Sequence, residues 1–139
     1  MQVIHDKVTV PRQNPSVSRP RLLRMLGEGL DSCASTVITG RAGTGKTLLA
    51  KDFARSCARR TSWYTVEASD GELKIFFRYL VESVSRQCPG FGRKVLANFA
   101  GSPVFDDVPA LAEAFIYELQ ECGGGGDPAG LLEALDAAL

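Results

Sequence analysis

Residues 35–50 read STVITGRAGTGKTLLA and join a β-branched run, a glycine-rich turn and the beginning of an apolar helical repeat. The β-branched residues at 35–39 favour a strand. After the turn, Leu49, Phe53 and Cys57 recur at the spacing of one helix face. This stretch therefore predicts a strand at 35–39, a tight turn, and a helix that begins near Lys46.

The turn matches the pattern G-x-x-x-x-G-K-[ST], known as Walker A, from Gly40 to Thr47. Its glycines permit backbone conformations closed to other residues and let main-chain N–H groups approach phosphate oxygens. The N-terminus of the following helix brings positive partial charge to the same place. Lys46 adds a mobile charge, and the Thr47 hydroxyl is suited to Mg²⁺. The turn predicts a site for a nucleotide with Mg²⁺.

Lys46 is the candidate catalytic residue, and Thr47 is the candidate metal ligand. The residues that we expect to bind the nucleotide are Gly40, Arg41, Ala42, Gly43, Thr44, Gly45, Lys46, Thr47 and Leu48. The side chain of Arg41 is expected either to contact phosphate or to make no contact.

Hydrolysis needs a further acid, which positions Mg²⁺ and water from a neighbouring strand after about four apolar residues. We find only Val104 and Phe105 before Asp106 and Asp107, and we expect these aspartates to cap the next helix. Glu67 is expected to be an exposed carboxylate at the end of a strand. The sequence thus lacks a convincing Walker B strand, and we expect the chain to bind nucleotide but to hydrolyse it poorly.

The chain divides into three parts: an extended arm at 1–19, a core at 20–122, and a glycine-rich break with a terminal helix at 123–139. We expect a short strand at 7–10 within the arm and a second core strand at 62–67. Helices are predicted from residue 20, at 73–88 behind a capping box of Ser69 and Glu72, at 91–100, at 108–119 and at 128–135. The predicted fold class is α/β, with a parallel sheet between helices in three layers, of which the N-terminal portion is present.

Composition excludes several classes of protein. The 139 residues carry 16 basic and 16 acidic side chains and no net charge, so no global attraction to nucleic acid or to a membrane is expected. No apolar run is long enough to span a bilayer. The four cysteines lack metal-ligand spacing and are expected to be unpaired thiols of a cytoplasmic protein.

The order of features resembles the N-terminal ATPase domain of MalT-like, LuxR-type transcription regulators, a group of signal-transduction (STAND) ATPases. The likeness rests on Arg19-Pro20-Arg21-Leu22, on the loop GRAGTGKT, on the stretch from Trp63 to Glu67, and on Phe77-Arg78-Tyr79-Leu80. It covers residues 8–122. Where the family loop usually has proline and an aromatic residue, this chain has Arg41 and Thr44.

The resemblance implies a regulatory switch that binds ATP and Mg²⁺. It also implies that the full-length protein self-associates and binds DNA through a C-terminal domain absent from this chain, which itself has no direct nucleic-acid contact. It places residues 16–20 near the base, with Arg19 as a candidate base contact. The alternative is part of a P-loop enzyme such as a helicase or a nucleotide kinase, since these proteins share the same loop.

Overall fold

The computed structural model describes residues 3–12, 17–33, 35–99, 107–122 and 131–137, with the backbone alone at 98–99 and 131–137. A 3-10 helix η1 (His5–Val8) precedes α1 (Pro20–Ser32) and α2 (Lys46–Ser56). Strand β1 (Arg60–Val66) and a 3-10 turn η2 (Ala68–Asp70) lead into α3 (Leu73–Ser85), α4 (Arg93–Phe99) and α5 (Val108–Cys122). Strand β2 (Leu131–Ala137) follows.

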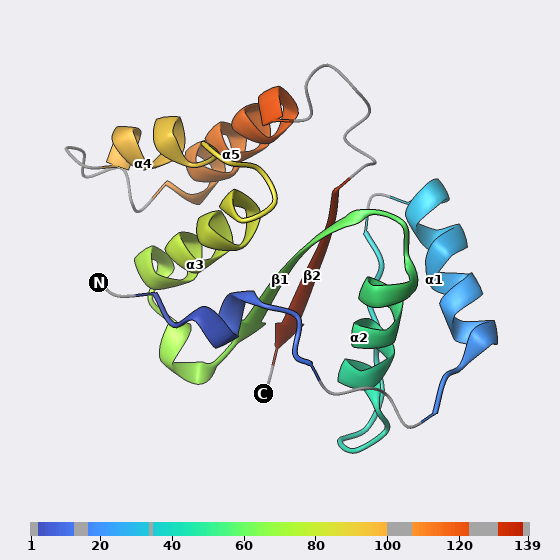
Figure 1. Cartoon of the computed structure of the whole chain (residues 1–139). Helices are drawn as coiled ribbons and strands as arrows, with labels where there is room; N and C mark the ends of the chain where they lie inside the picture. Colours follow the sequence, from blue (N-terminus) through green and yellow to red (C-terminus); the bar gives the residue numbers. More distant parts are fainter. Residues whose placement is uncertain (1–2, 13–16, 34, 100–106, 123–130, 138–139) are drawn as a thin grey trace.

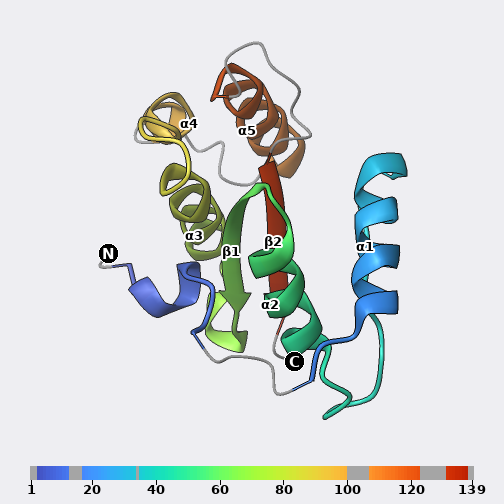
Figure 2. The same cartoon turned by 45° about the vertical axis from the view of Figure 1, so that its right-hand side comes forward.

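The two strands lie between two groups of helices (Figures 1 and 2). Helix α3 packs on β1, and α4 and α5 pack on each other on the same side. Helix α2 lies against β2 on the opposite side, and α1 packs on α2 as the outermost element. The described elements thus form helical layers on both sides of a strand pair. The complete three-layer P-loop fold stays a prediction.

β1 and β2 pair in parallel, with Arg60 opposite Leu131 and Val66 opposite Ala137. Parallel neighbours need a long crossover, and here η2, α3, α4 and α5 supply it. Both carboxyl ends therefore lie at one edge. The turn at 40–45 and the N-terminus of α2 lie toward the same end of the molecule (Figures 1 and 2).

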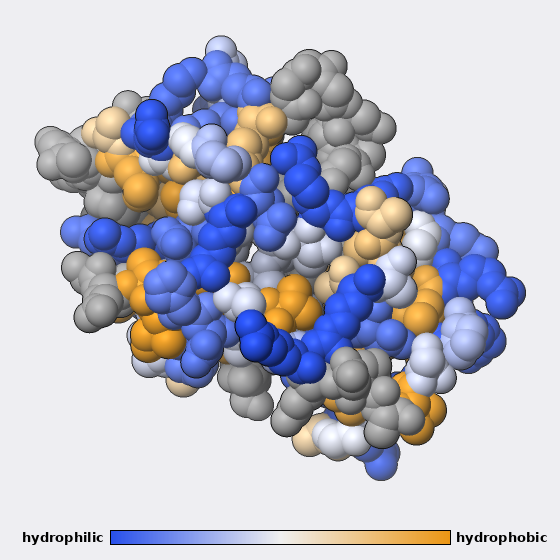
Figure 3. Space-filling model, viewed as in Figure 1, coloured by the Kyte–Doolittle hydropathy of each residue, from blue (hydrophilic) through white to orange (hydrophobic). Residues whose placement is uncertain are grey.

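The main core lies between α3, α4 and α5. Phe115 of α5 meets Phe77 and Phe91 edge-on, with ring centroids 5.8 and 5.1 Å away. The buried residues of this core are Phe77, Val81, Val84, Phe91, Val95, Leu111 and Phe115. The buried carboxylate of Glu118 accepts the N–H groups of Gly92 and Val95, both at 2.9 Å, and so caps the beginning of α4. On the face in Figure 3, hydrophilic side chains separate the apolar ones into small patches.

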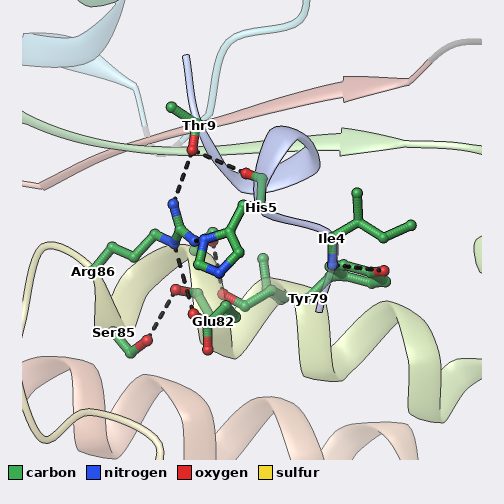
Figure 4. A network of polar contacts seen from close by, with 9 residues as sticks. Ile4, His5, Thr9, Tyr79, Glu82, Ser85 and Arg86 are labelled. Atoms are coloured by element: carbon green, nitrogen blue, oxygen red, sulfur yellow. Dashed lines mark hydrogen bonds and ion pairs between the residues drawn. The ribbon is translucent and has the colours of Figure 1, made fainter. Parts of the chain in front are cut away.

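The N-terminal segment packs on α3 and β1. Val8 is buried against Tyr64 and Tyr79, whose rings stack at 5.5 Å. Figure 4 shows Arg86, the C-cap of α3, reaching the ring of His5 and the hydroxyl of Thr9. The first residues of the chain are thus held by side chains from the middle of the sequence.

Lys7 is buried and forms ion pairs with Asp70, at 2.7 Å, and with Glu67, at 2.9 Å. Burial alone would lower the pKa of Lys7, but the two carboxylates outweigh it and raise this pKa. Burial alone would raise the pKa of Asp70, but hydrogen bonds from Lys7 and from the Glu67 N–H outweigh it and lower this pKa. The cluster therefore favours the charged form of both groups.

Five helix predictions are confirmed, with shifts at their ends, and so is the strand near 62–67. The strand predicted at 7–10 is wrong, since η1 turns there to bring Lys7 to its carboxylate partners. The capping box of Ser69 and Glu72 is also wrong. The box formed uses Glu67 and Asp70 around η2, because Asp70 is held in place by Lys7.

The strand predicted at 35–39 does not form: residues 35–40 are irregular, and Val37 is 80% exposed. A strand requires a hydrogen-bonded neighbour, and in the described part of the chain the sheet contains only β1 and β2.

The terminal helix predicted at 128–135 is wrong over residues 131–135, which belong to β2, while residues 128–130 lie outside the described ones. Alanine, leucine and glutamate favour helix, but pairing with β1 overrides this weak preference.

The expectation of four unpaired thiols is wrong as well. The sulfurs of Cys88, three residues after α3, and of Cys122, at the end of α5, form a disulfide, with Cα atoms 6.2 Å apart. Cys33 and Cys57 are free.

We predict that Asp70→Asn lowers the free energy of unfolding by about 3–5 kcal/mol, because it removes one partner of a buried charge. The wild-type contribution of Asp70 is lost as pH falls below the ordinary carboxyl range, since its pKa is lowered in the fold. The contribution of Lys7 to the free energy of unfolding is lost only as pH rises past the raised pKa of this lysine.

Urea unfolding measured from pH 3 to 8 tests this. The difference between the two proteins should shrink toward pH 3. A difference that is constant across the range would contradict the assignment of a charged Asp70. The exposed Asp31, which pairs with Arg59 on the surface, provides the control Asp31→Asn.

Candidate phosphate-binding site

The loop of residues 40–47 has the backbone that its glycines predict. Gly43 and Gly45 adopt positive φ angles of 77° and 82°, in the left-handed region. Gly45 is the N-cap of α2, and the N–H of Leu49 closes the first helical turn onto its carbonyl at 3.0 Å. The first N–H groups of a helix have no partner within the helix. The loop thus places the N–H groups at the N-terminus of α2 next to Gly43 and Gly45, where the chain turns.

Lys46 folds back over the loop. Its Nζ donates to the carbonyl oxygens of Gly40 and Arg41, at 2.9 Å each. The carbonyl of Arg41 also accepts the hydroxyl of Thr44 at 2.7 Å. The ammonium therefore lies within the curve of the loop.

The other predicted loop residues are close by. Arg41 and Ala42 are exposed, Thr47 is half-buried, and Leu48 is 38% exposed. All nine predicted residues belong to one turn and the first helical turn after it, so the structure brings them together.

Residues 17–19 lie beside this loop. The hydroxyl of Ser18 donates to Asp52 of α2 at 2.9 Å, and Arg19 donates to the carbonyl of Thr44 at 3.0 Å. A small open pocket of about 130 Å³ separates this segment from α2. Its lining consists of Val17, Arg19, Gly45, Leu48, Leu49 and Asp52. A pocket with apolar and polar walls therefore adjoins the loop.

The two described carboxylates that the sequence singled out, Asp107 and Glu67, have partners away from this loop. Asp107 accepts the N–H of Ala110 at 3.1 Å and so caps α5, as predicted. Asp106 and the preceding Val104 and Phe105 lie outside the described residues. Glu67 is bound to Lys7. Neither Asp107 nor Glu67, the two described carboxylates considered for positioning Mg²⁺, contacts the loop.

The structure instead draws attention to Asp136, which the sequence reasoning missed. It is the sixth residue of β2 and lies opposite Thr65, near the carboxyl ends of both strands. Four apolar residues, Leu131, Leu132, Ala134 and Leu135, occupy the strand before it. This is the signal that could have revealed it, but Glu133 interrupts the run and the composition suggested a helix.

Comparison with protein-family models, with curated proteins and with solved structures finds no match to this chain. Among the described residues, no helix is both long enough and apolar enough to cross a bilayer.

We predict that Gly45→Ala disrupts the loop. The φ angle of 82° is unfavourable for alanine by about 1 kcal/mol, and the added Cβ would lie 2.9 Å from Nη2 of Arg19. Thermal unfolding should show a lower midpoint. The control is Gly27→Ala in α1, where a Cβ meets nothing within 4 Å. This variant should gain about 0.5–1 kcal/mol from helix propensity. Equal midpoints for the two variants would contradict the prediction.

Proposed function

We propose that this chain is the ATP-binding module of a signal-transducing regulatory NTPase. The observation that carries the proposal is the loop at 40–47: two glycines with positive φ, a lysine inside the curve of the loop, and the N-terminus of α2. Together these features suit a phosphate chain, because they supply backbone N–H groups and positive charge at one place. The position of the loop near the carboxyl ends of β1 and β2 supports it, since ligands of open α/β sheets bind at that edge.

Mg²⁺ belongs to the same proposal. Thr47 would hold it from the loop, and the ion would neutralise charge on the phosphates. The backbone of β2 places Asp136 near the carboxyl ends of the strand pair, which makes it the candidate for a second protein ligand. The donor chemistry fits, since a hydroxyl and a carboxylate both offer the oxygen ligands that Mg²⁺ prefers. In this proposal Asp136 positions Mg²⁺, the role for which Asp106 and Asp107 were considered in the sequence. Lys46 remains the candidate catalytic residue. Poor hydrolysis remains our expectation, because Glu133 interrupts the apolar run of β2 and a metal-positioning carboxylate does not by itself orient the attacking water.

The regulatory character rests on the resemblance to MalT-like regulators. A nucleotide biases two conformations only by its different affinity for them, and self-association and DNA binding by the full-length protein are part of this proposal. A cytoplasmic location goes with it, since ATP is available there. The alternative is a P-loop enzyme such as a helicase or nucleotide kinase. Nucleotide-dependent strand separation would favour a helicase, and nucleotide-dependent self-association of the full-length protein would favour the switch.

We predict that Mg·ATP at a hundredfold over its Kd adds about 2.7 kcal/mol to the apparent free energy of unfolding. Lys46→Ala should remove most of this gain and leave the ligand-free midpoint nearly unchanged, because its contacts are exposed. Thermal shifts measured with and without Mg·ATP test this, with exposed Lys74 of α3 changed to alanine as the control. An equal gain in wild type and Lys46→Ala would refute the assignment of the loop.

We predict that Asp136→Asn removes the increase in ATP affinity that Mg²⁺ provides, while Asp107→Asn keeps it. The reason is that Asp107 already accepts the N–H of Ala110 as the cap of α5, whereas Asp136 lies near the carboxyl end of β2. The measurement is the ratio of the Kd for ATP in EDTA to that in Mg²⁺. A ratio that drops in Asp107→Asn and not in Asp136→Asn would return the metal-positioning role to the segment before α5.

A further inference from the structure

Arg19 lies between α1, α2 and the loop at 40–47. It is the N-cap of α1, and its carbonyl accepts the N–H of Leu23 at 3.0 Å. The preceding residue, Ser18, is bound to Asp52 of α2. The backbone of Arg19 is therefore bonded to α1 and follows a residue that is bonded to α2, so the side chain of Arg19 extends from a segment held by both helices.

The guanidinium of Arg19 reaches the phosphate loop. Nη2 donates to the carbonyl of Thr44 at 3.0 Å. The same nitrogen lies 2.9 Å from the position that a Cβ of Gly45 would take. The absence of a side chain at Gly45 thus serves two needs, the positive φ and the close approach of the arginine.

The contact determines the direction of one peptide group. The peptide between Thr44 and Gly45 is planar and trans, so its carbonyl and its N–H point in opposite directions. Because Arg19 holds the carbonyl of Thr44, the N–H of Gly45 points away from the guanidinium. A loop that binds phosphate through its N–H groups needs their directions fixed before the ligand arrives.

We propose that Arg19 is a positioning residue of the phosphate loop, which acts on the phosphate chain through the Thr44–Gly45 peptide. This inference rests on the proposed function, and it differs from the base contact that the resemblance implies. It predicts that Arg19 affects all ligands that carry the phosphate chain equally, whatever base they bear.

The test compares three ligands without Mg²⁺: ATP, GTP and inorganic tripolyphosphate. Kd values are measured for wild type, Arg19→Ala and Arg19→Lys, with exposed Arg24 of α1 changed to alanine as the control. We expect Arg19→Ala to weaken all three by the same factor, about three- to tenfold, as for loss of a charged hydrogen-bond donor at an exposed site. Arg19→Lys should recover part of the loss, because lysine keeps the charge but not the planar fork.

Two further measurements separate positioning from a general effect on folding. The ligand-free thermal midpoint should be the same in Arg19→Ala and Arg24→Ala. Amide hydrogen exchange at residues 40–47 should be faster in Arg19→Ala only.

Unchanged affinities in Arg19→Ala would overturn the inference. So would a loss for ATP or GTP without a loss for tripolyphosphate, which would show a base contact. If wild type binds none of the three ligands, the proposed function fails, and the inference fails with it.

Discussion

The parallel pairing of β1 with β2 is the constraint on which the arrangement of the site depends. It joins residues 60–66 to residues 131–137, so the chain between them has to cross over and return. The crossover places α3, α4 and α5 on one side and leaves α2 on the other. Because the strands run in the same direction, both end toward the glycine-rich loop at 40–47. The pairing thereby brings Asp136, close to the end of the sequence, to the same end of the molecule as the glycine-rich turn at 40–45.

The second constraint is electrostatic. Buried Lys7 joins the beginning of the chain to Asp70, which caps the backbone at Glu67 immediately after β1. Burial together with the nearby Asp70 carboxylate also raises the pKa of the Tyr64 hydroxyl, so this ring stays neutral in the core. The N-terminal segment is therefore an integral part of the fold, and Arg55 of α2 holds it further along by donating to the carbonyl of Pro11.

The local features of the sequence predicted the local structure well. The apolar stripe of α3, the glycine-rich turn at 40–45 with the helix after it, and the cap at Asp107 depend on neighbours within a few residues, and each is found. The features that failed depend on distant partners. Residues 131–137 have helical composition but pair with β1, and residues 35–39 have strand composition but lack a neighbour in the described sheet. Likewise, the pairing of Cys88 with Cys122 and the ion pairs of Lys7 join residues more than 30 positions apart, which spacing along the chain does not reveal.

The unpaired segment at 35–39 has a consequence for the behaviour of the chain in solution. It is rich in β-branched residues, and Val37 is 80% exposed without a hydrogen-bonded strand beside it in the described sheet. An exposed stretch of this kind is a template for strands of other molecules, which natural proteins usually cover, charge or interrupt with proline. The neighbouring residues Ser35, Thr36 and Thr39 carry no charge that would repel such a strand. We therefore expect that, in concentrated preparations of this chain, strands of other molecules add to this segment.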